Sequence, residues 1–350
     1  MDNQFQQWSV GLLGKTPRAW QQRLTLLLVT LSSIFGLAAT ANAQVRKLNI
    51  AYTATSPYQA ATIIAKETGL FRKHGLDVTM IFTSGGSLGI QAMVSGDVAI
   101  NVSDGAASVG ARLSGIDNVM FASFLNTFPY SLISIPEIKQ VSQLKGTSVA
   151  VSRFGSATDL GVRMALGRVG LNADRDVTML QIGAQTARFA ALQSKQVQST
   201  IITPPFTLTA RKLGFNTLID MAQLNIPYQL TVLTAMRGYI KENPATIQAV
   251  VAAVSEAIHY YKTEKGSTLK ILARYLKTDD MEALEETYRE VALKTLPEKP
   301  YPSVAGIQTV LDEYAKRVPK AKNMKPEEFI DSSFVRKLDD DKFYERLYKH

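Results

Sequence analysis

Cysteine is absent from this chain of 350 residues, and histidine occurs at only three positions. The lack of cysteine excludes disulfide bonds, thiolate metal ligands and cysteine nucleophiles. It also excludes the lipid-bearing cysteine that tethers many exported proteins to a membrane. His74, His259 and His350 are widely separated, and none of them has the spacing of a metal-binding motif. We therefore expect neither a metal site nor a cofactor.

Long apolar runs are also scarce, since the only one lies near the N-terminus, at residues 24–39. Basic residues precede this run, and small residues that suit a signal peptidase follow it up to Ala43. This order is typical of a signal peptide, and the run is shorter than the roughly 20 apolar residues that span a membrane. We predict that residues 1–43 are cleaved off after Ala43. Because the mature chain would carry no tether, we expect it in the periplasm.

Clusters of basic residues are missing as well. The formal net charge is +9, yet no run of five or more Lys and Arg residues occurs. Nucleic-acid binding requires basic residues gathered on one face or along one helix. We interpret the scattered charges as a solvated surface, and we expect a monomer with no nucleic-acid partner.

The most informative pattern is an internal repeat with a constant offset of 99 residues. Asp77-Val78-Thr79-Met80 returns as Asp176-Val177-Thr178-Met179, and further identities continue in the same register. Self-similarity at a fixed period indicates a repeated structural unit. The sequence therefore predicts two related lobes.

Each repeat reads as strands that alternate with helices. In the first half the predicted strands cover residues 48–52, 76–82 and 98–102, and in the second half residues 147–151, 177–181 and 199–202. Further strands are expected at 119–126, 130–135 and 229–235, and helices from Asn243 onward. This alternation predicts an α/β fold in which each lobe has a mainly parallel sheet flanked by helices, with a helical C-terminal extension. Lobe 1 is expected to comprise residues 44–138 and 226–350, and lobe 2 residues 139–225. The two crossings, near 136–146 and 220–230, would form a hinge.

One formal catalytic motif is present. Residues 85–89, Gly-Gly-Ser-Leu-Gly, match the G-x-S-x-G pattern of a serine hydrolase, between a predicted strand and a helix. Such an enzyme needs a histidine later in the chain, but His259 lies inside a predicted helix and His350 is the last residue. A secreted hydrolase that uses Ser87 is therefore only a remote alternative, and we do not expect an enzyme.

Small polar loops lie instead between strand ends and helix starts in both halves. The clearest are Ser84-Gly85-Gly86-Ser87, Ser103-Asp104-Gly105 and Arg153-Phe154-Gly155-Ser156. Helix starts carry unpaired backbone N–H groups and a partial positive charge, which suit anionic or polar ligands. In open α/β sheets ligands bind at the carboxyl ends of the strands. Two facing lobes would direct these loops into one cleft.

The charge and the aromatic content of the loops leave the ligand class open. Arg153 could pair with a sulfonate, a carboxylate or a nitrate. Asp104 could accept a hydrogen bond from an amine, so a zwitterion is an alternative. Tyr58, Phe154 and Phe206 lie at loop–helix junctions and would also allow an aromatic or pyrimidine-type ligand.

Several short motifs are shared with a known family, namely Ala65-Lys66-Glu67-Thr68-Gly69-Leu70-Phe71, Gly75-Leu76-Asp77-Val78, Ser84-Gly85-Gly86-Ser87, Ala92-Met93-Val94-Ser95-Gly96-Asp97-Val98 and Ala190-Ala191-Leu192-Gln193-Ser194. On these motifs, residues 48–262 resemble the nitrate/sulfonate/taurine-type substrate-binding proteins of ABC importers, which are related to binders of thiamine-pyrimidine precursors. The resemblance implies a two-lobed periplasmic binding protein (type II-like) that closes over a small solute by a hinge motion. Its partner would be an ABC-importer permease in the inner membrane, or a membrane sensor.

The resemblance also implies a set of ligand-binding residues. In the first lobe these are Ser56, Tyr58, Ser84, Gly85, Gly86, Ser87, Ser103, Asp104 and Gly105. In the second lobe they are Arg153, Phe154, Gly155, Ser156, Gln185, Thr203 and Phe206.

Overall fold

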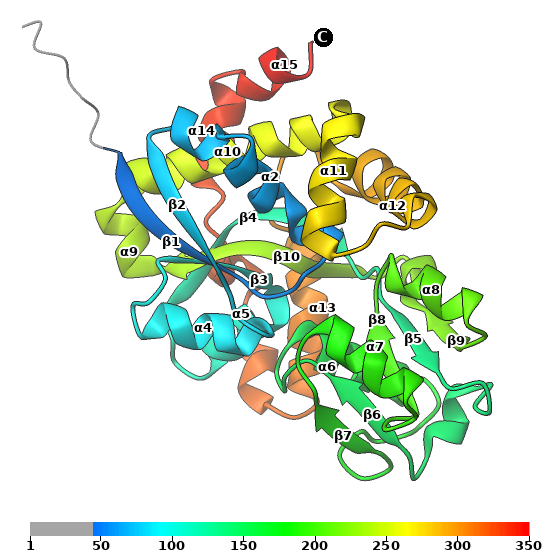
Figure 1. Cartoon of the computed structure of the whole chain (residues 1–350). Helices are drawn as coiled ribbons and strands as arrows, with labels where there is room; N and C mark the ends of the chain where they lie inside the picture. The colour runs from blue at the N-terminus through cyan, green and yellow to red at the C-terminus, as the bar shows by residue number, and fades with distance from the viewer. Residues whose placement is uncertain (1–44, 350) are drawn as a thin grey trace, which may run out of the picture. The chain divides into compact units, whose positions relative to one another are not determined.

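The computed structural model describes residues 45–349 (Figure 1). The predicted signal peptide lies outside these residues. The described residues contain two five-stranded sheets, each flanked by helices. Across this part of the chain, no helix combines the length and the apolar character that are needed to cross a membrane.

The first sheet has the strand order β2-β1-β3-β10-β4. Its strands are β1 (Arg46–Tyr52), β2 (Leu76–Phe82), β3 (Ile100–Asp104), β4 (Asn118–Thr127) and β10 (Pro227–Met236). Only β10 runs against the other four strands, since β1 pairs in parallel with β2 and β3, and β10 pairs antiparallel with β3 and β4. We call this sheet with its helices lobe 1.

The second sheet has the order β7-β6-β8-β5-β9. Its strands are β5 (Ser131–Ser134), β6 (Ser148–Val151), β7 (Thr178–Gln181), β8 (Ser199–Ile202) and β9 (Asn216–Asp220). Here β5 is the single reversed strand. We call this sheet with its helices lobe 2. The prediction of mainly parallel sheets is confirmed, with one reversed strand in each.

The strand registers confirm the internal repeat. In lobe 1, Asn49 faces Thr79 across the β1–β2 pair, and in lobe 2, Ser148 faces Thr178 across the β6–β7 pair. Each position in lobe 2 is 99 residues after its counterpart. Helix α4 (Gly86–Val94) likewise returns as α7 (Gln185–Gln193) at the same offset. The two lobes therefore share their arrangement as well as their sequence pattern.

The first crossing between the lobes lies earlier than the sequence predicted. Strand β5 pairs with β8 and β9, so the chain leaves the first sheet after Thr127 and enters the second at Ser131. The boundary expected at residue 138 is therefore wrong by about one strand. The return crossing lies between Asp220 and Pro227, within the expected range of 220–230. Strand β9 was not predicted.

Helices cover both faces of the sheets (Figure 1). Those that follow the strands of lobe 1 are η1 (Pro57–Gln59), α2 (Ala60–Glu67), α3 (Leu70–Lys73), α4 and α5 (Gly105–Leu113). Those of lobe 2 are η2 (Val141–Leu144), α6 (Ala157–Gly167), α7, α8 (Phe206–Lys212) and η3 (Met221–Leu224). The expected loop at 103–105 is absent, because β3 runs to Asp104 and α5 begins at Gly105.

The chain after β10 is helical, as predicted. Its elements are α9 (Arg237–Glu242), α10 (Pro244–Thr263), α11 (Lys265–Leu276), α12 (Met281–Tyr288), the π-helix η4 (Arg289–Thr295), α13 (Val304–Ala315), η5 (Pro319–Asn323), η6 (Pro326–Phe329), α14 (Ser333–Asp340) and α15 (Phe343–Leu347). Helix α10 packs on α2 and buries Ile247, Val250 and Val254, which lie on one face of its helical repeat. Helix α13 contacts β10 and α5 of lobe 1 and also α6 of lobe 2.

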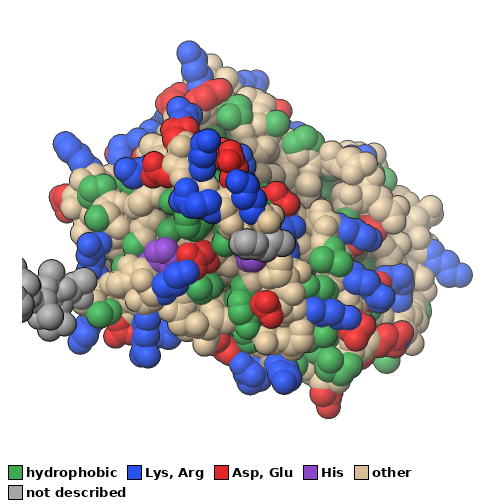
Figure 2. All heavy atoms as spheres, turned by 90° about the horizontal axis from the view of Figure 1, so that it is seen from above, with side chains coloured by type: hydrophobic (Ala, Val, Ile, Leu, Met, Phe, Trp, Pro, Cys, Tyr) green, Lys and Arg blue, Asp and Glu red, His purple; other side chains and the backbone are tan. Residues whose placement is uncertain are grey.

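The described surface carries mixed charge. On the face in Figure 2, basic and acidic side chains are interspersed. This distribution agrees with the interpretation of a solvated surface.

Candidate functional site

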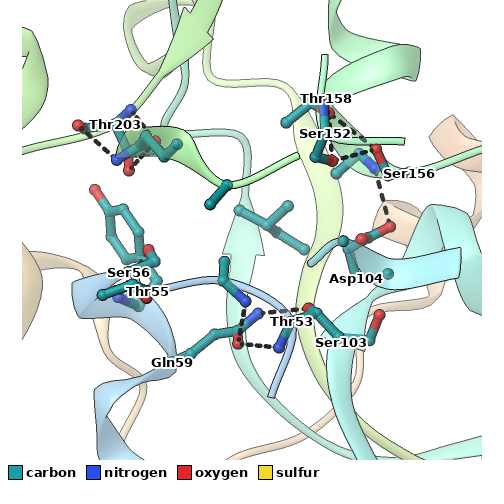
Figure 3. A pocket seen from close by; sticks show the side chains of 18 of the residues that line it. Thr53, Thr55, Ser56, Gln59, Ser103, Asp104, Ser152, Ser156, Thr158 and Thr203 are labelled. Atoms are coloured by element: carbon teal, nitrogen blue, oxygen red, sulfur yellow. Dashed lines mark hydrogen bonds between the residues drawn. The ribbon is translucent and has the colours of Figure 1, made fainter. Parts of the chain in front are cut away.

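A small cavity of about 50 Å³ lies between the lobes, where strands of both sheets end. We call it the inner cavity (Figure 3). Lobe 1 contributes Thr53, Ala54, Thr55, Ser56, Tyr58, Gln59, Gly85, Gly86, Ser103, Asp104, Leu230 and Thr231. Lobe 2 and the first crossing contribute Tyr130, Ser152, Ser156, Ala157, Thr158, Gly183, Ala184, Gln185, Arg188 and Thr203.

The first residues of three helices, and the N-cap residue of a fourth, line this cavity. Gly86 begins α4 and Gly105 follows the lining residue Asp104 at the start of α5, both in lobe 1. Ala157 begins α6 and Gln185 begins α7, both in lobe 2. Each helix has nine or more residues, so its backbone dipoles add to a partial positive charge at its start. The two lobes therefore direct positive potential toward one space.

Hydroxyl and amide groups of the two lobes face each other across the cavity (Figure 3). In lobe 1, the backbone N–H of Thr53 donates to Oε1 of Gln59 at 3.0 Å. In lobe 2, the backbone N–H of Ser152 donates to Oγ1 of Thr158 at 2.9 Å. Both pairs span six residues and are separated by the repeat offset. The hydroxyl of Ser156 joins those of Ser152 and Thr158 at 2.9 Å from each.

Arg188 is the cation of the inner cavity, and no acidic residue among residues 45–349 forms an ion pair with it. Its side chain is 3 % exposed. The guanidinium donates to the backbone carbonyl oxygens of Gly183 and Ile201, whereas its Nε–H has no hydrogen-bond partner among the described residues. Burial lowers the pKa of Arg188 to about 10, so the side chain stays protonated at neutral pH. A guanidinium has five N–H donors, and these contacts leave donors available for a ligand.

Asp104 is the acidic residue of the cavity lining, and its carboxylate links the two lobes. Its Oδ1 accepts from the backbone N–H of Ala107 in lobe 1 at 2.9 Å and from that of Ala157 in lobe 2 at 3.0 Å. Burial raises the pKa of Asp104 to about 6, although these two hydrogen bonds act in the opposite direction. The carboxylate is therefore engaged by two helix starts and is less available to a ligand than the sequence suggested.

Other contacts also hold the lobes together around the cavity. Ser87 Oγ of lobe 1 donates to the carbonyl oxygen of Phe154 in lobe 2 at 2.8 Å. The Tyr314 hydroxyl lies 3.0 Å from the carbonyl oxygen of Ala106 and 3.2 Å from that of Gly155. These contacts define a closed arrangement of the two lobes.

The structure brings nine of the sixteen predicted site residues to the inner cavity. These are Ser56, Tyr58, Gly85, Gly86, Ser103, Asp104, Ser156, Gln185 and Thr203. The other seven, Ser84, Ser87, Gly105, Arg153, Phe154, Gly155 and Phe206, do not line it. Phe154 is exposed, and Phe206 packs edge-on against Phe189, so neither ring faces the cavity.

Arg153 does not occupy the position that the sequence suggested. Its aliphatic part packs against Gly85 across the interface between the lobes. The arginine of the cavity is Arg188, which sequence reasoning missed together with Tyr130. One signal for Arg188 was present, since it shares the buried face of α7 with Ala191 and Leu192. A cation on an apolar face is unusual unless it has a specific role.

The contacts of Ser87 do not match the hydrolase hypothesis. Its hydroxyl is engaged by Phe154, His74 Nε2 lies 3.1 Å from Glu256, and His259 packs on the ring of Tyr348. Neither His74 nor His259 lines the inner cavity. Within residues 45–349, no group of three or more His, Asp or Glu side chains could hold a metal ion.

Comparison with known proteins shows that this chain is similar to proteins that are named as binding proteins. The family model described as NMT1/THI5 like matches residues 56–264. A protein of Brucella abortus that is named as a binding protein is 28% identical over 268 residues, which cover 74% of this chain and 80% of the relative. A protein of Escherichia coli that is named as an aliphatic sulfonates-binding protein is 26% identical over 72% of this chain and 78% of its own length.

Solved structures share the fold at lower identity. The alkanesulfonate-binding protein SsuA from Xanthomonas axonopodis pv. citri, bound to MOPS, has a TM-score of 0.66 at 19% identity, and covers 79% of this chain and 97% of its own. The periplasmic nitrate-binding protein NrtA from Synechocystis has a TM-score of 0.70 at 15% identity, with coverage of 84% and 88%. The two-lobed periplasmic-binding-protein fold and the resemblance to sulfonate- and nitrate-type binders are thereby confirmed. All four proteins are named as binding proteins, in agreement with the expectation of a non-enzymatic chain.

Proposed function

The chain belongs to the NMT1/THI5-like family, and on this premise we propose that it is the solute receptor of an ABC importer. It captures a small anion of the sulfonate, carboxylate or nitrate type between its lobes and delivers it to an inner-membrane permease. It acts as a monomer in the periplasm after removal of residues 1–43. The relatives named for sulfonate and nitrate binding support the class of ligand.

The observation that carries the proposal is the unpaired guanidinium of Arg188 in the inner cavity. A buried charge is costly unless a partner compensates it. Backbone carbonyls of Gly183 and Ile201 accept hydrogen bonds from this group but do not neutralise it. The starts of α4 in lobe 1 and of α7 in lobe 2 add positive potential from both sides, whereas the Asp104 carboxylate already engages the starts of α5 and α6. An anion would compensate Arg188 and the starts of α4 and α7 at once.

The size of the cavity favours a compact charged group. A single buried water needs roughly 10–15 Å³ of such space, so about 50 Å³ admits a few non-hydrogen atoms. This suits a sulfonate, a carboxylate or a nitrate and is too small for an aromatic ring. The alternative of an aromatic or pyrimidine-type ligand would require a wider opening of the lobes, and Tyr58 and Tyr130 are the aromatic side chains at the cavity.

The proposal is tested by calorimetric binding measurements on residues 44–350, unfolded and refolded to remove bound solute. The panel contains methanesulfonate, taurine, acetate, succinate and nitrate, with neutral pyrimidines as the contrasting class. We expect one anionic class to bind. Arg188→Met should weaken this binding by about 100-fold, since a hydrogen bond to a charged group contributes roughly 1.5–3 kcal/mol.

Arg153→Met is the matched control, because Arg153 does not line the cavity. The affinity of this variant for the anion should stay within about threefold of the wild-type affinity. Arg188→Met leaves two carbonyl oxygens without their donor, so its melting temperature is measured in parallel. Tyr130→Phe is a second variant, which removes one hydroxyl from a residue that lines the cavity. Binding of pyrimidines but not anions, or equal loss in Arg153→Met, would overturn the proposed ligand class.

A further inference from the structure

Asp104 has one carboxylate oxygen that the protein leaves free. The two hydrogen bonds of its side chain, from the backbone N–H groups of Ala107 and Ala157, both go to Oδ1. Oδ2 accepts no hydrogen bond from the described residues. Asp104 is 8 % exposed, and Oδ2 is not among the unpartnered atoms that lack accessible surface. A ligand can therefore reach Oδ2.

This free oxygen lies at the inner cavity, beside the start of α4. Asp104 and Gly86 both line the cavity, and a Cβ added to Gly86 would lie 2.4 Å from Oδ2. Only a glycine leaves room for the carboxylate at this place. In Figure 3 the side chain of Asp104 extends from lobe 1 toward Ser156 of lobe 2. Oδ2 is thus an acceptor held in place between the two lobes.

The two charged side chains of the inner cavity do not neutralise each other. Arg188 donates to backbone carbonyl oxygens, Asp104 accepts from backbone N–H groups, and within residues 45–349 the two side chains form no ion pair. Both are close to Tyr130. Burial raises the pKa of Tyr130 to about 12, Arg188 acts against this rise, and Asp104 adds to it. A buried charge is costly without a partner, so the cavity has one cationic and one anionic group to compensate.

We propose that Asp104 is a specificity residue that selects solutes in which a hydrogen-bond donor accompanies the acidic group. The inference rests on the proposed function, because the acidic group occupies Arg188. A carboxylate only accepts hydrogen bonds, so an ammonium or a hydroxyl group satisfies Oδ2, whereas a methyl group leaves the charge unpaired. Since the cavity admits few atoms, a short chain must join donor and acid. The substrate class narrows to short amino or hydroxy acids.

The experiment compares short acids that differ in one terminal group. Taurine, isethionate and propanesulfonate carry an ammonium, a hydroxyl and a methyl group on the same chain, and β-alanine, 3-hydroxypropanoate and butanoate are their carboxylate counterparts. Binding is measured by calorimetry on the refolded chain 44–350. In the set that binds, we expect a donor-ended acid to bind at least about tenfold more tightly than the methyl-ended acid. A larger gain for the ammonium than for the hydroxyl would identify an amino acid as the class.

Asp104→Asn tests whether Oδ2 is the group that selects. The two backbone N–H groups hold the asparagine carbonyl at the position of Oδ1, so its NH₂ group replaces Oδ2. An ammonium group then meets another donor, whereas a hydroxyl group can accept from it. The preference for the ammonium over the methyl group should therefore be lost. Asp312→Asn, which removes an exposed carboxylate, is the matched control and should keep the wild-type preference.

The pH dependence of the wild type gives a second readout that needs no variant. Burial raises the pKa of Asp104 to about 6, against the effect of the N–H groups at the starts of α5 and α6. Burial also raises the pKa of Tyr130, Tyr228 and Tyr314, the titratable groups close to Asp104, so they stay protonated. Arg188 and the sulfonates stay charged. The preference for taurine over propanesulfonate should thus fall below about threefold at about pH 5, because Asp104 must first release a proton.

Three results would overturn the selection by Asp104. They are equal binding of the methyl-ended and donor-ended acids, an ammonium preference that survives in Asp104→Asn, and a preference that does not change between about pH 7.5 and 5. In each of these cases the acids still bind, so the proposed function stands. Absence of binding by every acid, with or without a donor, would instead refute the proposed function, and the selection with it.

Discussion

Asp104→Asn tests whether the negative charge of the carboxylate between the two lobes lowers the free energy of unfolding. Its Oδ1 accepts from the starts of α5 and α6. An asparagine side chain has nearly the same shape and can place its carbonyl oxygen in the same position. The substitution therefore removes the charge while both acceptor contacts can be kept.

The magnitude follows from the pKa of Asp104, which burial raises from 3.8 to about 6. Because the folded-state pKa is raised, the folded protein binds the proton more tightly than the unfolded chain does. The contribution of Asp104 to stability is thus most favourable below about pH 4 and is lost as the pH rises through 6. The full difference is roughly 3 kcal/mol, at 1.36 kcal/mol for each pH unit.

The assay is thermal unfolding of the wild type and Asp104→Asn between about pH 4.5 and 7.5, without ligand. At the upper end the variant should be more stable by roughly 3 kcal/mol, which for a chain of about 300 residues corresponds to a melting temperature about 5 °C higher. At the lower end the advantage should fall to roughly 1 kcal/mol, because most of the folded wild-type molecules are then protonated. Asp312→Asn, at an exposed carboxylate that accepts from Gln308, should run parallel to the wild type.

The opposite sign would refute this reasoning. If Asp104→Asn melts below the wild type at neutral pH, the two helix starts stabilise the carboxylate by more than burial destabilises it. A difference that does not change with pH would show that the protonation of Asp104 is not involved.

Two glycines allow further tests of packing. Gly85→Ala should lower ligand affinity about tenfold. Gly85 has a φ of 102°, and an added Cβ would lie 2.9 Å from Cγ of Arg153 in the other lobe. Calorimetry with the best-binding acid measures the loss of affinity. An unchanged affinity would show that closure does not bring these groups together. Gly161→Ala should destabilise lobe 2 by about 1–3 kcal/mol, because the new Cβ would lie 2.5 Å from Phe128 and 2.7 Å from Ile201. Chemical denaturation measures this change, and a difference below about 0.5 kcal/mol would contradict the packing described.

Most of the fold could be predicted because the chain repeats itself. Strands and helices that recur at one offset support each other's prediction. In this way the repeat predicted β1, β2 and α4 together with their counterparts β6, β7 and α7. The first crossing could not be predicted in the same way. Strands β4 and β5 are separated by three residues, and both are largely buried. Nothing in such a pattern tells which sheet the second strand joins, since this depends on pairing partners that lie far away in the sequence.

The part of the candidate site that backbone geometry determines could be predicted from the sequence. The position of its charged residue could not. Loops at helix starts are visible in the sequence as small polar residues after a strand, and nine of the sixteen residues that the resemblance implied line the inner cavity. The choice between Arg153 and Arg188 depends on burial. Arg153 lies in such a loop, and its position in the sequence suggested an accessible side chain. Arg188 lies one turn after the start of α7, yet it lines the cavity.

The repeat by itself does not distinguish the two arginines, because Arg153 also corresponds to an uncharged residue, Ala54. At the offset of 99 residues, Arg188 corresponds to Gly89, and Asp104 corresponds to Thr203. The two charged residues of the inner cavity therefore stand where the other lobe has an uncharged residue. Shared positions such as Thr53 and Ser152 build the scaffold of hydrogen bonds in both lobes. A solute such as a sulfonate presents different groups to the two lobes, so the positions at which the repeats diverge in charge are where selectivity for such a solute is expected to lie.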